Sequence, residues 1–103
     1  MQNTEIERVA HHLDRALARH GYLVGRAPEM VPVKVYKAPK VAGDHARFML
    51  QEIPHILEES TTIEAMLKAQ RWLRFAEGIV WALGVKTIME LQEVHEGEEG
   101  EVW

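Results

Sequence analysis

Apolar side chains recur every three or four residues between Ile6 and Leu17, which is the spacing of one buried face on an α-helix. Charged residues occupy most of the other positions in this stretch. Thr4 is followed three residues later by Glu7, a capping-box pattern that begins helices, and Gly21 stands where a glycine commonly ends one. The pattern predicts an amphipathic first helix that packs one face against the rest of the domain.

Three prolines, Pro28, Pro32 and Pro39, interrupt the helical pattern after this first helix. Within the same region apolar and polar residues alternate along Val31–Lys37, which is the period of a β-strand with one face buried. Proline restricts such a strand to the edge of a sheet, and its sole visible partner is Tyr22–Val24. We therefore predict a short extended or β segment, with an arm without regular structure as the alternative.

A second helix is predicted from Asp44, as its capping residue, to about Glu59. Pro54 lies inside this helix and should kink it or split it after Ile53, because proline lacks the N–H that a helical hydrogen bond needs. The apolar residues expected to bury this helix are Phe48, Met49, Ile53, Ile56 and Leu57.

The third predicted helix is the longest, Thr62–Leu83, with Thr61 and Glu64 as its capping box and Gly84 as the residue that ends it. Its apolar residues fall mainly in one arc, which we predict to be its buried side. The members of this arc are Met66, Ala69, Trp72, Leu73, Ala76, Ile79, Val80 and Leu83.

A fourth, short helix is predicted after the capping box Thr87 and Glu90, and it ends near His95. The predicted fold class is therefore mainly α: a single four-helix domain over residues 1–96, with the short extended or β segment between the first two helices. Residues 97–103 are rich in glycine and glutamate and are expected to form an acidic flexible tail.

The long third helix also carries apolar residues on its other side. Trp81 is nine residues from Trp72, which places the two rings on opposite sides at roughly 100° per residue. Gly78 lies inside this predicted helix, where a glycine costs about 1 kcal/mol of helix stability relative to alanine. The close approach of a neighbouring segment commonly offsets such a cost. We predict that the chain binds itself or another protein through Ile63, Gln70, Arg74, Gly78 and Trp81.

The alternative interpretation of this second side is purely structural. In that case Trp81 is a core residue beneath the first or second helix, and Arg74 and Glu77 form an ion pair within the third helix.

Composition narrows the class of protein. The chain has 103 residues, enough for one domain, and contains no cysteine, so it has no disulfide framework. It has no apolar run of the roughly 18–20 residues that a membrane span needs, and its first residues lack the apolar core of a signal peptide. We therefore expect a cytoplasmic protein without membrane association. The net charge of −4 is uneven, since six glutamates and no lysine or arginine follow Lys86.

Catalytic and metal-binding motifs are missing from the sequence. His11 and Asp14 are one helical turn apart, but no second pair of metal ligands follows at a suitable spacing. The chain has no glycine-rich phosphate loop, and its single serine, Ser60, has no obvious base nearby. We therefore expect no enzymatic activity, no cofactor and no metal site.

A basic segment, Arg26–Arg47, offers a second functional hypothesis. Lysines beside an aromatic side chain can contact single-stranded nucleic acid, although lysines also commonly protect an exposed edge strand. The candidate contacts are Lys34, Tyr36, Lys37 and Lys40. Arg74 is an alternative phosphate ligand, so the second hypothesis is a nucleic-acid or nucleotide-binding protein.

The stretch "KAQRWLRFAEGIVWALGVKTIMEL", Lys68–Leu91, resembles the signature of a family of small uncharacterised proteins from tailed phages and prophages. That signature is approximately K-A-x-R-W-L-G-F-x-Q-G-V-L-W-x-x-G-x-x-T-I-x-E-L. This chain departs from it at Arg74, where the family has glycine, and at Glu77, where it has glutamine. The resemblance implies a phage or prophage accessory protein in the cytoplasm of a bacterial host. Its expected partners are a second copy of itself, most simply in a dimer, and a host or phage protein.

Overall fold

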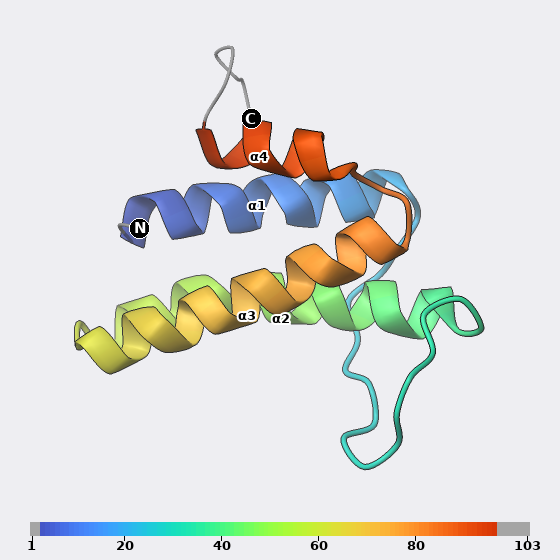
Figure 1. The fold of residues 1–103 in the computed structure, drawn as a ribbon. Coiled ribbons are helices and arrows are strands. Elements are labelled where there is room, and N and C mark those ends of the chain that lie inside the picture. Colours follow the sequence, from blue (N-terminus) through green and yellow to red (C-terminus); the bar gives the residue numbers. More distant parts are fainter. Residues whose placement is uncertain (1–2, 97–103) are drawn as a thin grey trace.

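The structure is a computed structural model that describes residues 3–96, and these residues form four helices and no strand (Figure 1). The helices are α1 (Asn3–Arg19), α2 (Pro39–Glu59), α3 (Ile63–Ala82) and α4 (Ile88–Glu96). α1, α2 and α3 pack against one another, and the short α4 lies along α1 (Figure 1). The prediction of a mainly α four-helix fold is confirmed, while the predicted acidic tail lies outside the described residues. No described helix is long and apolar enough to cross a membrane.

Two helices end as predicted, at glycines with positive φ. Gly21 has φ of 91° and Gly84 has φ of 77°, a backbone region that side chains with a Cβ rarely adopt. After Gly21, the N–H of Tyr22 donates to the carbonyl of Leu17 at 3.2 Å, and after Gly84 the next N–H returns to Val80 at 3.1 Å. These hydrogen bonds use carbonyl groups that a helix end otherwise leaves without a partner.

Of the predicted helix starts, the last one is confirmed. The Thr87 N–H donates to a carboxylate oxygen of Glu90 at 2.8 Å, and the Thr87 hydroxyl accepts the Glu90 N–H at 3.0 Å. The second box is wrong by one residue, because Thr62 rather than Thr61 caps α3 and accepts the Ala65 N–H at 3.1 Å. Thr4 is not a cap either, since α1 already includes residue 3.

The start of α2 was predicted wrongly by five residues. The helix begins at Pro39, whose fixed φ and missing N–H suit the first turn of a helix. Asp44 therefore lies within α2, where its carboxylate accepts the Leu23 N–H at 2.9 Å and a hydrogen bond from Lys40 at 2.7 Å. α2 continues through Pro54, so the helix is not split there.

The predicted strand is wrong. Val31–Lys37 is irregular and ends in a tight turn, in which the N–H groups of Lys37 and Ala38 both donate to the carbonyl of Lys34 at 2.9 Å. Alternating valines were a poor guide because no other described segment offers this one a strand to pair with.

The core lies between α1, α2 and α3. Half of the α3 residues in the predicted arc are fully buried in this core, and the other half are partly buried against it. The predicted buried side of α3 is therefore confirmed. The buried members of the core cluster are Ile6, Val9, Ala10, Leu13, Leu17, Ala46, Leu50, Ile53, Leu57, Ala69, Leu73, Ala76, Val80 and Val94.

A glycine inside α2 brings the loop after α1 onto the core. A Cβ at Gly43 would lie 2.2 Å from Cδ1 of Tyr22, so the Tyr22 ring packs directly against the helix backbone. Arg47 fixes the same loop, because its guanidinium donates to the Tyr22 carbonyl at 2.8 Å and to Asp14 on α1 at 2.7 Å. The Arg47 and Asp14 side chains are only 16% and 14% exposed, so this ion pair is well protected from water.

Candidate interaction surface

The side of α3 that faces away from the core is open to solvent. Trp81 is 54% exposed, Ile63 71% and Leu67 45%, so Trp81 is not a core residue in this chain. The structural alternative for Trp81 is therefore wrong. We call this surface the outer face of α3, and its members are Ile63, Leu67, Gln70, Arg71, Arg74, Gly78 and Trp81.

Gly78 lies on the outer face with nothing packed against it. A Cβ built on Gly78 meets no atom of another part of the described residues, 3–96, within 4 Å. The packing of residues 3–96 therefore gives no reason for a glycine in the middle of α3.

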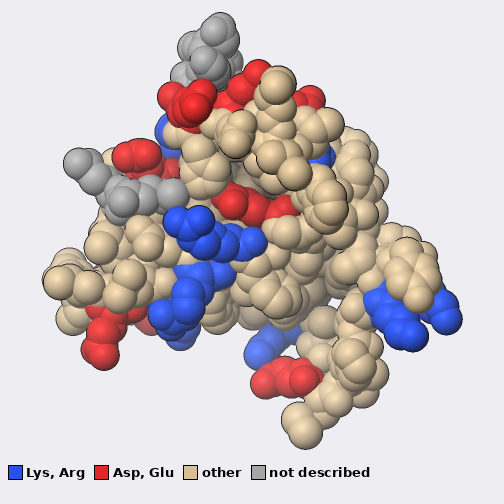
Figure 2. Space-filling model, in the orientation of Figure 1, with Lys and Arg blue, Asp and Glu red and all other residues tan. Residues whose placement is uncertain are grey.

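The charged residues of α3 are arranged differently from the ion pair expected in the structural alternative. Glu77 hydrogen bonds to the Nε2 of His95 on α4, rather than pairing with Arg74. Arg74 and Arg71 are exposed, and neither guanidinium makes an ion pair or hydrogen bond with another residue among 3–96. Lys68 is also exposed, with its ammonium group 5.4 Å from the centre of the Trp72 ring. Figure 2 shows basic side chains gathered over the middle of α3.

A shallow depression of about 340 Å³ separates α3 from α4, and Arg74 and Glu96 both line it. α4 is held in place at its last turn. The Arg8 guanidinium on α1 donates to the carbonyls of Val94 at 3.0 Å and His95 at 3.1 Å. These contacts place the end of α4 beside the basic middle of α3.

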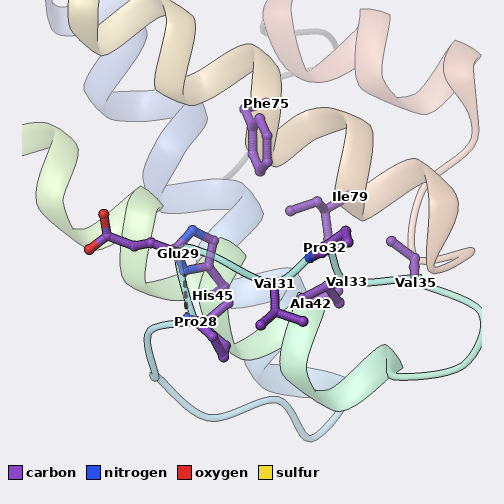
Figure 3. A pocket seen from close by; sticks show the side chains of 11 residues that line it. Pro28, Glu29, Val31, Pro32, Val33, Val35, Ala42, His45, Phe75 and Ile79 are labelled. Atoms are coloured by element: carbon purple, nitrogen blue, oxygen red, sulfur yellow. Dashed lines mark hydrogen bonds between the residues drawn. The ribbon is translucent and has the colours of Figure 1, made fainter.

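A second, mainly apolar cleft of about 400 Å³ lies under the loop before α2 (Figure 3). Phe75 and Ile79 of α3 form one wall and Ala42 of α2 forms another, while the carboxylate of Glu29 points out of the cleft. The loop residues that line the cleft are Ala27, Pro28, Val31, Pro32, Val33 and Val35.

His45 supplies the one imidazole of this cleft. Its Nδ1 accepts the Ala27 N–H at 3.0 Å, so this nitrogen is unprotonated and the neutral ring carries its proton on Nε2. Burial, and then the nearby charge of Arg26, lower the pKa of His45. The ring stacks on Phe48 with centroids 5.8 Å apart. These contacts anchor the loop, and no motif in the sequence signals them.

The basic segment Arg26–Arg47 is largely occupied by contacts within the chain. Arg26 lies 3.6 Å from Glu29 and 5.0 Å from the centre of the Phe48 ring, and Lys40 binds Asp44. The predicted nucleic-acid contacts Lys34, Tyr36, Lys37 and Lys40 are all exposed, and Lys37 lies over the Tyr36 ring at 5.9 Å.

Within residues 3–96, no group of three or more histidine or acidic side chains is placed to hold a metal ion. Asp14, half of the metal pair considered in the sequence, binds Arg47 and also accepts a hydrogen bond from Gln51 at 3.2 Å. His12, which the sequence analysis passed over, lies partly buried on α1. Burial lowers its pKa from 6.5 to about 4, and the charges of Lys86, Arg19, Arg8 and His11 act in the same direction.

Comparison of the chain with protein families, curated proteins and solved structures finds no match. The resemblance of Lys68–Leu91 to a phage signature therefore stays a prediction.

Proposed function

We propose that this protein acts by binding another protein chain through the outer face of α3, and that it assembles with itself, most simply as a dimer. The observation that supports this proposal is the exposure of Trp81, Ile63 and Leu67 on one side of a helix whose opposite side is core. Large apolar side chains exposed along one helix face, with arginines between them, are the residue types that protein–protein contact surfaces use, and tryptophan and arginine are enriched at their centres.

Gly78 adds to this support. It lies on the same surface one turn from Arg74 and three residues before Trp81, with open space where a side chain would be. A second helix can approach a glycine more closely than any other residue, which increases the contact made by the surrounding side chains. The cost of a glycine inside α3 is then offset in the assembled state.

The phage resemblance extends this proposal to a biological setting. A phage or prophage accessory protein that works by contact would meet a bacterial host protein, or a phage protein, in the host cytoplasm. Lys68–Leu91, the part of the chain that carries the resemblance, includes most of the outer face of α3.

The test is light scattering behind a sizing column, with the wild type beside Trp81→Ala. We expect a wild-type dimer or larger assembly, and a folded monomer for the variant, whose free energy of unfolding should change by less than about 1 kcal/mol. Tyr36→Ala is the matched control, because it removes an aromatic side chain that is 77% exposed on the loop instead. A wild type that is monomeric at every accessible concentration would refute self-association.

A second candidate function is binding of a nucleotide or nucleic acid. The observation in its favour is the exposed pair Arg71 and Arg74, which have no ion pair among the described residues and lie on the same face as the Trp81 ring. Guanidinium groups bind phosphate and aromatic rings stack on bases. The absorbance ratio at 260 and 280 nm, recorded in the same sizing run at low and high salt, distinguishes this candidate, since bound nucleic acid is released by salt.

A further inference from the structure

The cleft under the loop before α2 lies apart from the outer face of α3, because Phe75 and Ile79, which form its α3 wall, are on another side of that helix. Its volume of about 400 Å³ is near the lower end of the range typical of small-molecule sites. The apolar walls are open to solvent, since Phe75 is 58% exposed and Val31 on the loop is 60% exposed. A small apolar ligand in the cleft would remove this surface from water, which is favourable.

The loop side of the cleft is a continuous apolar wall. Val31, Val33 and Val35 are spaced two residues apart, and all three line the cleft (Figure 3). The alternation that did not form a strand therefore still places its valines on one side of the segment. Pro28 and Pro32 line the cleft as well, and their rings fix the backbone φ angle at two points of the loop.

His45 supplies this apolar cleft with one hydrogen-bond donor. Because the Ala27 N–H donates to Nδ1 at 3.0 Å, the proton of the neutral ring is on Nε2. No residue among 3–96 accepts a hydrogen bond from this Nε2–H. Of the described residues that line the cleft, His45 alone has a side-chain N–H or O–H group. A buried polar group needs a hydrogen-bond partner, so the cleft favours a ligand with a single small acceptor group.

The charge near His45 favours an anionic acceptor. The Arg26 guanidinium lies 5.0 Å from the centre of the Phe48 ring, and that ring stacks on His45. Burial, and then the positive charge of Arg26, lower the pKa of His45, so this charge acts at the ring. Glu29 pairs with Arg26 at 3.6 Å, but its carboxylate points out of the cleft and both side chains are exposed (Figure 3). An exposed pair of this kind neutralises the arginine only weakly.

We propose that this cleft binds a small monocarboxylate with an apolar tail, the chemistry of a medium-chain fatty acid. The carboxylate accepts the Nε2–H of His45, and the tail lies between the loop valines and the wall formed by Phe75 and Ile79. This function goes beyond the proposed protein binding and does not depend on it, because the cleft and the outer face of α3 share no residue.

The experiment is an NMR titration of isotope-labelled wild-type protein with octanoate, kept below the concentration at which it forms micelles. We expect saturable shifts of the backbone amide signals along Val31–Val35 and at Ala42, Phe75 and Ile79. Hexanoate should bind about fifteenfold more weakly than octanoate, since each methylene that is buried contributes about a factor of four. Octan-1-ol, which has the same tail and no charge, should bind more weakly than octanoate, because hydrogen bonds to a charged acceptor are stronger.

Two substitutions on the loop form a matched pair. Val31→Asp places a negative charge at the cleft and should weaken octanoate binding at least about tenfold. Val24→Asp introduces the same charge at a valine of the same loop that does not line the cleft, and it should leave the affinity unchanged. Both valines are exposed, at 60% and 46%, so neither variant should unfold the chain.

Arg26→Gln tests the charged end of the cleft. It should weaken octanoate binding about two- to fivefold, the effect of one exposed charge, and leave octan-1-ol binding unchanged. An equal loss for both ligands would show that Arg26 shapes the loop instead of attracting the carboxylate, and would overturn the assigned orientation.

Three results would overturn the proposal as a whole. These are the absence of saturable shifts up to about 1 mM octanoate, octan-1-ol binding as tightly as octanoate, and shifts centred on Leu67 and Trp81 of the outer face instead of the cleft. None of them bears on the light-scattering comparison of the wild type with Trp81→Ala, so failure here is distinct from failure of the proposed assembly.

Discussion

Gly43 and Gly78 both lie inside long helices, yet they have opposite surroundings. At Gly43 the ring of Tyr22 occupies the place of a side chain, 2.2 Å from where a Cβ would be. At Gly78 the same place is empty. The first glycine is explained by the packing of the chain on itself, whereas nothing in the described part of the chain explains the second.

The contrast extends to the helix faces that carry these glycines. Near Gly43, the loop after α1 is held on α2 by the side chains of Asp44, His45 and Arg47, each of which bonds to a backbone group of that loop. Around Gly78, α3 presents Trp81 and two arginines to solvent. We call the surface of α2 around Gly43, which the loop after α1 covers, the closed face, and the outer face of α3 around Gly78 the open face. The two faces should respond differently to substitution.

The largest effect is expected at the closed face. Gly43→Ala should lower the free energy of unfolding by about 3 kcal/mol, because the new methyl group requires the Tyr22 ring or the helix to move. Urea denaturation measures this change. In a Tyr22→Ala background the same substitution should be nearly neutral, and a full penalty there would show that the ring is not the cause.

A second, smaller effect on the free energy of unfolding is expected when the pH falls, because this protonates His12, which is partly buried on α1. Burial holds its folded-state pKa near 4, below the value of 6.5 expected when the chain unfolds, so protonation favours the unfolded state. The contribution of His12 is complete above about pH 6.5 and is lost as the pH falls toward 4. We expect a loss of about 2 kcal/mol, less than the full shift implies because the side chain keeps some contact with water.

Thermal unfolding between pH 7 and pH 4.5 measures this loss. His12→Gln is the control, and its melting temperature should fall less steeply over that range than that of the wild type. Parallel curves for the two proteins would assign the acid sensitivity to other groups, of which His45 is the first candidate because its pKa is lowered too.

The smallest effect on folding is expected at the open face, and it has the opposite sign. Gly78→Ala should raise the free energy of unfolding by up to about 1 kcal/mol at low protein concentration, where the chain is monomeric, since alanine favours a helix and its Cβ meets nothing. The same variant should weaken self-association in light scattering. Unchanged association would show that no helix approaches Gly78 closely, even if Trp81 is part of the contact.

Local patterns in the sequence predicted the parts of the fold that depend on neighbouring residues. Gly21 and Gly84 were recognised as helix ends, and Thr87 with Glu90 as a helix start, because each motif acts within one turn. The buried arc of α3 followed from its periodicity alone. The start of α2 was missed because Asp44 was read as a cap, although Pro39 carried its own signal for a first turn.

Features that depend on distant residues were not predictable in this way. Glu77 is close enough to Arg74 for an ion pair within α3, but α4 brings His95 to it instead. The role of Gly43 depends on Tyr22, which comes from another segment of the chain. For the outer face, periodicity placed Trp81 opposite Trp72 but left open whether another helix covers it. In the structure α1 and α2 pack on the other side of α3, and α4 packs on α1, so Trp81 stays exposed.

The Arg8 contact also bears on the order in which the chain folds. The contact joins Arg8 to Val94 and His95, which lie 86 and 87 positions later in the sequence. In contrast, α2 and α3 are neighbours in the sequence and are connected by a short turn. Closing a longer loop costs more chain entropy, so the pairing of α2 with α3 should come early and the docking of α4 on α1 late. During synthesis on the ribosome α1 is made first, but Arg8 can bind the carbonyl groups of Val94 and His95 only after almost the whole chain has been made.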